Sequence, residues 1–350
     1  MRVAYAFRPF PANYKPSCDA TLPAAPTPYY PLRTSSSIPA IQTQQRQLTS
    51  LYVNGVPYIV IRLIGEGLHS RVYAAYDPRT NQSVAIKVVK NVDPADSHEH
   101  SKMFFKEIRY LTKLQTRNPY VIRVYNHEYD SKTQTGKIVM ESGHDFRFML
   151  PLQASPKEKQ MTIAHAKFYW SQMVDAVAKL HRNGIVHSDI KPENFIMTPE
   201  GQIRVIDLGL SFRMSHTQSS ILRPFAGTPE YMPPEVCQIE NGHYSRQGTP
   251  EYMPPEVCQI ENGHYSRQGR ASDIWALGVL LFEMIFGYRP FEHIHDNFDK
   301  MTHIARLTDT PIIPPINNPH VRDIIQQCLQ INPARRPTAQ QILQHPFFTF

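Results

Sequence analysis

A run of polar residues between His187 and Asn194 constrains this chain more than any other feature. It reads His187-Ser188-Asp189-Ile190-Lys191-Pro192-Glu193-Asn194, and Asp207-Leu208-Gly209 follows it. Phosphoryl transfer needs one carboxylate to orient the attacking hydroxyl, one cation to neutralise the moving phosphate, and an amide with a second carboxylate to hold magnesium. Asp189, Lys191, Asn194 and Asp207 can supply these groups in that order. A polar loop that arose by chance would seldom contain all four at these offsets, so the run predicts a phosphotransferase.

The size and composition of the chain fit a globular protein. It has 350 residues, of which 41% are hydrophobic, and a formal net charge of +7. The length suggests one large domain or two small ones. The basic residues do not form a run of five, as a nucleic-acid patch would, so we expect no direct binding to nucleic acid. Acidic protein substrates or polyanionic surfaces are compatible with the charge.

The cysteines and the apolar segments predict an intracellular protein without a membrane anchor. The four cysteines are Cys18, Cys237, Cys258 and Cys328. Their spacing fits neither a disulfide framework nor a zinc site, which favours a reducing compartment. Residues 1–10 lack the long apolar stretch of a signal peptide. The longest apolar stretch, residues 276–288, contains Glu283 and is too short to span a bilayer, so we interpret it as a buried helix.

Residues 1–50 differ in composition from the rest of the chain. They contain eight prolines and polar runs such as Thr34-Ser35-Ser36-Ser37. Such a segment cannot bury enough apolar surface to offset the entropy lost on ordering. We predict a disordered tail that serves either as a linker or as a carrier of docking and phosphorylation sites. Residues 51–350 then form the folded part.

The folded part begins with a strand and a glycine-rich turn. Residues 58–64 have strand composition and lead into Gly65-Glu66-Gly67. Glycines let the backbone fold closely over ATP phosphates, although Gly-x-Gly alone is most often an ordinary turn. Val84-Ala85-Ile86-Lys87 reads as a later strand, with Lys87 to hold the α- and β-phosphates. Glu107 follows 20 residues later (107 − 87 = 20) in a helical pattern, where it can pair with Lys87 rather than act as a solvated charge.

The sequence predicts further strands and helices before and after the polar run. Residues 137–143 read as an apolar strand that ends at Gly143. Apolar residues recur at helical spacing over 169–180, just before the polar run. Residues 195–197 and 203–206 read as a hairpin that delivers Asp207. A last helix is expected over 342–348.

One segment of the chain is duplicated without a single change. Residues 227–247 and 248–268 both read GTPEYMPPEVCQIENGHYSRQ, a tandem repeat of 21 residues (248 − 227 = 21). Two copies are too few for a solenoid. A longer surface loop costs under about 1 kcal/mol in closure entropy, so one copy can be surplus. Arg336 is placed to pair with Glu235 of the first copy or Glu256 of the second.

From about residue 53 to 348, the order of these motifs resembles the eukaryotic protein kinase domain. Finer features are similar to the monopolar-spindle (TTK-like) dual-specificity checkpoint kinases. These features are Val53-Asn54-Gly55, Met140 before Glu141, the serine in Gly184-Ile185-Val186-His187-Ser188-Asp189, the duplicated Gly-Thr-x-x-Tyr-Met-Pro-Pro-Glu, and Gly287-Tyr288-Arg289-Pro290-Phe291. The resemblance implies a two-lobed α+β fold. A small antiparallel β N-lobe with one main helix would span about 51–141, and a larger, mostly α-helical C-lobe about 142–350.

The resemblance also implies roles for individual residues, with ATP and Mg²⁺ as cofactors. The implied catalytic residues are Asp189, Lys191, Lys87 and Glu107, and the implied magnesium ligands are Asn194 and Asp207. The implied nucleotide-binding residues are Ile64, Gly65, Glu66, Gly67, Val72, Ala85, Lys87, Met140, Glu141 and Gly143. Met140 would be the gatekeeper behind adenine, and the backbone of Glu141 and Gly143 would bond the adenine edge. Thr228 or Thr249 would bond Asp189 and Lys191, as in Ser/Thr kinases.

The segment after Asp207 carries hydroxyls that are candidate phosphorylation sites. They are Ser215, Thr217, Ser219, Ser220 and Thr228. Ser188 stands where most kinases have arginine, so a phosphate on this segment would lack its usual partner.

The resemblance implies protein substrates, kinetochore or spindle-checkpoint partners, and a location in the nucleus or at the kinetochore, otherwise in the cytoplasm. Three features depart from the family: the tail is far shorter than the usual targeting region, Leu208 replaces the common Phe, and Ser70 replaces a glycine. The doubled segment motivates an alternative, a pseudokinase scaffold that binds nucleotide or partners without turnover. The complete catalytic set favours the enzyme. A small-molecule phosphotransferase is disfavoured by the Gly-Thr…Pro-Pro-Glu segment.

Overall fold

The computed structural model describes residues 49–67, 70–90, 97–150, 161–238 and 265–349. The predicted tail up to residue 48, the tip of the glycine-rich turn and most of the second copy lie outside the described residues. The chain divides into two units, residues 1–43 and 44–350, and every element below belongs to the second.

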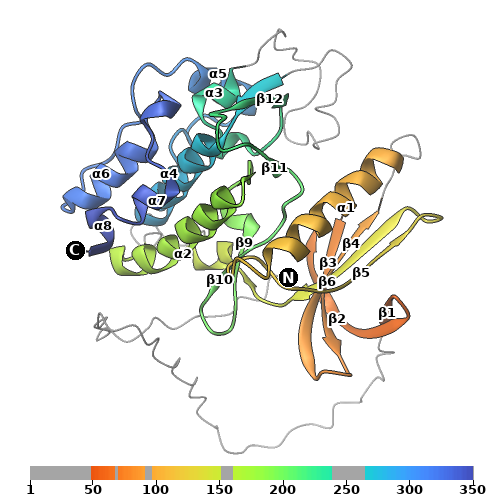
Figure 1. Ribbon diagram of the computed structural model, residues 1–350. Helices are drawn as coiled ribbons and strands as arrows, with labels where there is room; N and C mark the ends of the chain where they lie inside the picture. The colour runs from red at the N-terminus through yellow and green to blue at the C-terminus, as the bar shows by residue number, and fades with distance from the viewer. Residues whose placement is uncertain (1–48, 68–69, 91–96, 151–160, 239–264, 350) are drawn as a thin grey trace, which may run out of the picture. The chain divides into compact units, whose positions relative to one another are not determined.

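Six antiparallel strands form the sheet of the N-lobe (Figure 1). In spatial order they are β1 (Ser50–Val53), β2 (Val56–Glu66), β3 (Ser70–Asp77), β4 (Gln82–Lys90), β6 (Thr135–Glu141) and β5 (Val124–Asp130). Asn54 and Gly55 join β1 to β2 in a tight turn, with φ of 49° and 73°. Asparagine and glycine tolerate such positive angles better than other residues. The predicted strands at 58–64 and 84–87 are confirmed as parts of β2 and β4, and the one predicted at 137–143 is β6, which ends at Glu141, two residues before Gly143.

The main helix of the N-lobe, α1 (Ser97–Leu114), packs one face against the apolar core. Phe104, Ile108 and Leu111 recur at helical spacing and are at most 5% exposed. Gly136 of β6 allows this close approach, because a Cβ atom there would lie 2.4 Å from the ring of Phe104. The helix thus has a fixed position relative to the sheet, and it carries Glu107.

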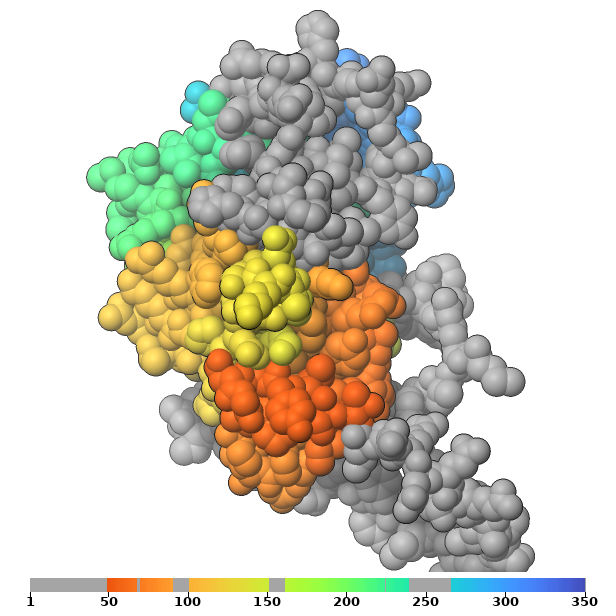
Figure 2. Space-filling model, turned by 90° about the vertical axis from the view of Figure 1, so that its right-hand side faces the viewer, coloured from red at the N-terminus to blue at the C-terminus, as the bar shows by residue number. Residues whose placement is uncertain are grey.

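The turn between β1 and β2 is fastened to β5. The Asn54 side chain donates to Asn126 Oδ1 and to the His127 carbonyl, at 2.8 Å each. In Figure 2 the yellow end of the β5–β6 hairpin lies beside the orange strands β1 and β2. These side-chain hydrogen bonds therefore connect the two edge strands of the sheet, β1 and β5, in addition to the backbone ladder.

Helices form most of the C-lobe (Figure 1). They are α2 (Ile163–Arg182), α3 (Pro234–Cys237), α4 (Arg270–Phe286), α5 (Asn297–Ala305), α6 (Pro319–Cys328), α7 (Ala339–Ile342) and α8 (Pro346–Thr349). The buried helix predicted over 276–288 is confirmed as α4, in which every residue from Ser272 to Phe286 is buried, but it ends at Phe286, and Tyr288 beyond it is exposed. Trp170 Nε1 of α2 donates to the Leu277 carbonyl of α4 at 2.9 Å. Within the described residues, no helix is both long and apolar enough to cross a bilayer.

Short strands and turns carry the polar residues between these helices. The hairpin of β9 (Phe195–Met197) and β10 (Ile203–Val205) is confirmed, and β9 also pairs with β7 (His144–Asp145). Two further antiparallel pairs are β8 (Ile185–Val186) with β11 (Phe212–Arg213), and β12 (Ile221–Pro224) with β13 (Tyr265–Gln268). Short 3₁₀ helices include η2 (Phe146–Met149), η3 (Pro192–Asn194), η4 (Pro229–Tyr231) and η6 (Pro333–Arg335).

The prediction of one last helix over 342–348 was wrong. The helix α7 ends at Ile342, and α8 begins at Pro346. Proline has no N–H to donate and disfavours helical geometry in the residue before it, so it interrupts a helix but can start one.

Candidate active site

The polar run forms a turn between α2 and β9 that is held by Asp273 of α4. Asp273 Oδ2 accepts from the His187 amide and Oδ1 from the Ser188 amide, both at 2.9 Å. His181 Nε2 lies 2.8 Å from Oδ2. Although burial opposes ionisation, the hydrogen bond and charge of His181 and the contacts of His187 lower the pKa of Asp273. The ionised carboxylate therefore fixes the backbone immediately before Asp189.

Sequence reasoning gave Asp273 no role. The feature that could have revealed it is a carboxylate directly before the apolar run Ile274–Leu277. A carboxylate buried there without partners would cost much free energy.

The carboxylate of Asp189 is held on two sides. Lys191 Nζ lies 2.7 Å from Asp189 Oδ2. Asn194 Nδ2 donates to Asp189 Oδ2 at 3.0 Å and to the Asp189 carbonyl at 2.7 Å. The structure thus brings together Asp189, Lys191 and Asn194, three of the four residues predicted to take part in phosphoryl transfer. The Oδ1 atoms of Asp189 and Asn194 are not used in these contacts.

The fourth residue, Asp207, lies beside Lys87. Lys87 Nζ is 2.9 Å from Glu107 Oε1 and 3.3 Å from Asp207 Oδ2. Burial opposes the charge of Lys87, but the two carboxylates raise its pKa. The charge of Lys87 lowers the pKa of Asp207 to about 2. One ammonium therefore connects β4, α1 and the acidic turn after β10.

The predicted nucleotide-binding residues lie on the neighbouring strands. Gly65 pairs with Val72 across the β2–β3 ladder, and Val72 faces Lys87 on β4. Gly67 donates to the Ser70 carbonyl at 2.8 Å and so closes the turn, whose residues 68–69 lie outside the described part. Ile64, at a bulge of β2, is 40% exposed.

Glu66 forms a surface ion pair with Arg71 at 2.8 Å, at the mouth of the same turn.

Ala85, Met140, Glu141 and Gly143 lie around the end of β6. Ala85 and Met140 are cross-strand partners, each 7% exposed. A Cβ on Gly143 would lie 2.7 Å from Ile196 Cδ1 and 2.9 Å from the Met197 carbonyl, so glycine fits best. Sequence reasoning missed Arg204 of β10, which is 6% exposed and donates from Nε to Glu141 Oε2 at 3.1 Å. That ion pair joins β6 to the β9–β10 hairpin.

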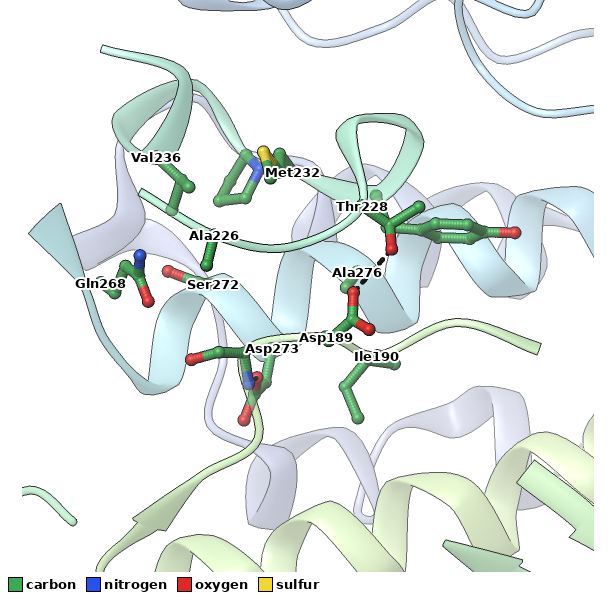
Figure 3. A pocket seen from close by; sticks show the side chains of 13 residues that line it. Asp189, Ile190, Ala226, Thr228, Met232, Val236, Gln268, Ser272, Asp273 and Ala276 are labelled. Carbon is green, nitrogen blue, oxygen red and sulfur yellow. Dashed lines mark hydrogen bonds between the residues drawn. The ribbon is translucent and has the colours of Figure 1, made fainter. Parts of the chain in front are cut away.

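The first copy of the duplication contacts the polar run. Thr228 Oγ1 donates to Asp189 Oδ1 at 2.7 Å, and Lys191 Nζ donates to Thr228 Oγ1 at 2.7 Å. Figure 3 shows Thr228 and Asp189 facing each other. Both residues line a cavity of about 20 Å³. The two polar segments therefore meet at one carboxylate.

Three more contacts anchor the first copy in the C-lobe. Arg336 binds Glu235 through both carboxylate oxygens, at 2.6 and 2.8 Å, whereas Glu256 lies outside the described residues. Tyr231 Oη donates to Glu283 Oε2 at 2.6 Å. Met232, Val236 and Cys237 of the first copy form a buried apolar cluster with Ile304 of α5.

The second copy contributes β13 to the described residues. Tyr265–Gln268 pairs with β12 and leads directly into α4. The fold therefore uses the beginning of one copy and the end of the other.

Comparison with known proteins identifies the architecture. A family model described as "Protein kinase domain" matches residues 58–247 and again 236–348. The chain belongs to the protein kinase family. The two matches overlap within the duplicated region, as expected where one segment is repeated.

Several curated kinases are similar over nearly the whole chain. The "Dual specificity protein kinase TTK" of Mus musculus is 31% identical over 96% of this chain and 37% of its own length. The Ttk of Danio rerio is 29% identical over 96% of this chain and 31% of its own length. The "Serine/threonine-protein kinase mph1" of Schizosaccharomyces pombe is 26% identical over 91% of this chain and 46% of its own length. The chain thus spans about a third to a half of the length of these relatives.

Protein kinases use ATP and Mg²⁺, and the residues present suit both. The Asp207 carboxylate and the Asn194 amide oxygen are hard ligands of the kind that Mg²⁺ prefers, and they leave positions for phosphate oxygens. Within the part of the chain that the structure describes, no three His, Cys, Asp or Glu side chains form a metal site of their own.

Proposed function

We propose that this chain is an active protein kinase that transfers the γ-phosphoryl group of ATP to serine or threonine of protein substrates. The observation that carries the proposal is the arrangement of Thr228, Asp189 and Lys191, each within 2.7 Å of the next. The same structure also contains the ion pair between Lys87 and Glu107, with Nζ and Oε1 2.9 Å apart. These contacts support the proposal, because they bring together the residues to which it assigns the transfer.

In this proposal each residue has one task. Asp189 orients the substrate hydroxyl and accepts its proton, and Lys191 neutralises the transferred phosphoryl group. Lys87, held by Glu107, binds the phosphates. Asn194 and Asp207 hold Mg²⁺, which bridges phosphate oxygens. Residues 64–67, Val72, Ala85, Met140, Glu141 and Gly143 enclose the nucleotide.

We also propose dual specificity and a role in spindle-checkpoint or chromosome-segregation signalling. The support is the similarity to the TTK kinases over 96% of this chain, together with the motifs shared with the monopolar-spindle family. Kinetochore or checkpoint proteins would then be partners, and the chain would act in the nucleus or at the kinetochore. The proposed single kinase domain comprises residues 51–350, with its lobes joined near Glu141.

Transfer of labelled phosphate from ATP with Mg²⁺ tests the proposal directly. The substrates are the chain itself and a generic basic protein, and phosphoamino acid analysis of the products tests dual specificity. We expect transfer by the whole chain and none by Asp189→Asn, which still binds ATP. Equal turnover by Asp189→Asn would refute its assignment. Silence from the whole chain and from a chain without residues 248–268 would favour a scaffold.

A further inference from the structure

A buried ion pair connects the last residue of β6 with the strand that leads to Asp207. Arg204 Nε of β10 donates to Glu141 Oε2 at 3.1 Å, and the two side chains are only 8% and 15% exposed. Separating a charge pair that is shielded from water in this way costs far more free energy than separating a pair on the surface. The ends of β6 and β10 are therefore held together by more than apolar packing.

The guanidinium of Arg204 has a fixed orientation. Its Nη1 donates to the Ile203 carbonyl at 3.3 Å, and its Nη2 donates to Gln202 Oε1 at 3.0 Å. Together with the bond to Glu141, these contacts engage all three nitrogens of the planar group, which leaves the side chain little freedom to rotate. A lysine would keep the charge but could not make three contacts in one plane. Arg204 therefore holds the Glu141 side chain by geometry as well as by charge.

The backbone around the pair forms one connected network. The Glu141 amide donates to the Arg123 carbonyl at 2.9 Å, and the Val205 amide donates to the Tyr120 carbonyl at 2.6 Å. The segment 120–123 is thus bonded both to the end of β6 and to β10. The ion pair closes this network through side chains, so β6 cannot shift relative to β10 without breaking several contacts at once.

The strand β10 also positions both proposed magnesium ligands. Asp207 lies two residues beyond its end (207 − 205 = 2), and the Ile206 amide donates to the Asn194 carbonyl at 2.9 Å. On the other side of the ion pair, the backbone of Glu141 is proposed to bind the adenine edge. The two ends of a bound nucleotide would therefore meet groups that are connected through Arg204.

We propose that Arg204 is a positioning residue that acts through Glu141. It sets the distance between the adenine-binding end of β6 and the magnesium ligands near β10, and it does so without touching the nucleotide. A chain in which this distance is already correct loses less conformational freedom on binding, so it binds MgATP more tightly. Adenosine has no phosphates and does not need the magnesium ligands, so its affinity does not depend on the ion pair. This inference rests on the proposed function, because it deepens the account of that same site.

Binding measurements by calorimetry test the proposal without any turnover. The Asp189→Asn chain and its derivatives are titrated with adenosine, and with a non-hydrolysable ATP analogue in the presence of Mg²⁺. We expect Arg204→Gln to raise the Kd for the magnesium–nucleotide complex about 5–20-fold, and the Kd for adenosine less than about twofold. Arg204→Lys should recover part of the loss, because it restores the charge.

The matched control is Gln202→Ala. It removes one hydrogen bond of the same guanidinium and leaves the bond to Glu141 in place. We expect both affinities of this variant to equal those of the parent chain. All titrations are made well below the Tm of each variant, so that unfolding does not contribute to the measured Kd.

A double-mutant cycle separates a positioning role from a merely structural one. If the pair acts as a unit, Glu141→Gln, Arg204→Gln and the double variant should lose the same affinity for the magnesium–nucleotide complex, whereas independent effects would add. Glu141→Gln and Arg204→Lys keep the test decisive if Arg204→Gln does not fold. An equal fold-change for adenosine and nucleotide, or no change for either, overturns this inference and leaves the kinase proposal standing. No nucleotide binding by the parent chain would overturn both.

Discussion

The Thr228 hydroxyl donates to Asp189 Oδ1 at 2.7 Å, across 39 positions of the sequence (228 − 189 = 39). The same hydroxyl accepts from Lys191 Nζ at 2.7 Å. One side chain of the first copy therefore orients the catalytic carboxylate and the cation beside it. In the proposed mechanism Asp189 faces the substrate hydroxyl, so the docking of this segment would also set the geometry of transfer.

Replacing this hydroxyl should slow transfer without preventing folding. We expect Thr228→Ala to lower kcat/KM by about 10–100-fold, since Asp189 and Lys191 lose their shared partner. Thr228→Ser should recover most of the activity, because it restores the hydroxyl. Thr249→Ala is the matched control from the second copy and should behave like the parent chain. If the two alanine variants were equally impaired, the first copy would not be the only one that acts.

Removing one partner of the Arg336–Glu235 pair should strongly destabilise the C-lobe. The Arg336 side chain is completely buried, and it also donates to the carbonyls of Ala271, Gln330 and Ile331. Removing Glu235 would leave a buried charge without its partner. We expect Glu235→Ala to lower the free energy of unfolding by about 3–5 kcal/mol in urea. Glu256→Ala should change it by less than about 0.5 kcal/mol; an equal loss would contradict the observed docking.

Glu283 should make stability depend on pH in an unusual direction. Burial raises the pKa of its carboxyl from 4.5 to about 6, despite the hydrogen bond from Tyr231. The folded state therefore holds this proton more tightly than the unfolded state. Its contribution is fully present below pH 4.5 and is lost as pH rises through 6, a difference of about 2 kcal/mol.

The comparison that isolates this effect is the parent chain against Glu283→Gln, by chemical unfolding between pH 4.5 and 7. The advantage of Glu283→Gln should grow with pH and level off above about 6, the folded pKa. A constant difference across this range would show that Glu283 titrates normally.

Removing residues 248–268 should preserve activity. The deletion joins Gln247 to Gly269 and restores a single copy, so every described contact can be made by an identical residue. We expect kcat/KM within about threefold of the parent chain, since a change in loop length alone costs little free energy. A rise of more than tenfold would show that the extra copy competes for the docking position, and a comparable fall would show that it contributes.

The sequence predicted the elements and site residues that follow from short-range spacing. It did not predict the ion pairs between residues far apart in the chain. The elements that carry Lys87, Glu107, Asp189 and Asp207 follow from local patterns. Arg204 on Glu141 was missed, because the pair joins residues that are 63 positions apart. The choice between the copies could not be made from identical letters. That choice depends on which copy the fold places next to Arg336, given that one end of the duplicated region follows β12 and the other leads into α4.

Cys237 of the docked first copy is completely buried against the C-lobe, and burial raises the pKa of its thiol. Its reaction with an alkylating reagent therefore requires the segment to lift from the C-lobe. Trypsin would release Cys237 and Cys258 in peptides of different mass, because it cleaves after Arg246 but not between Arg223 and Pro224. The protection of Cys237 relative to Cys258 therefore reports which copy is docked on the C-lobe.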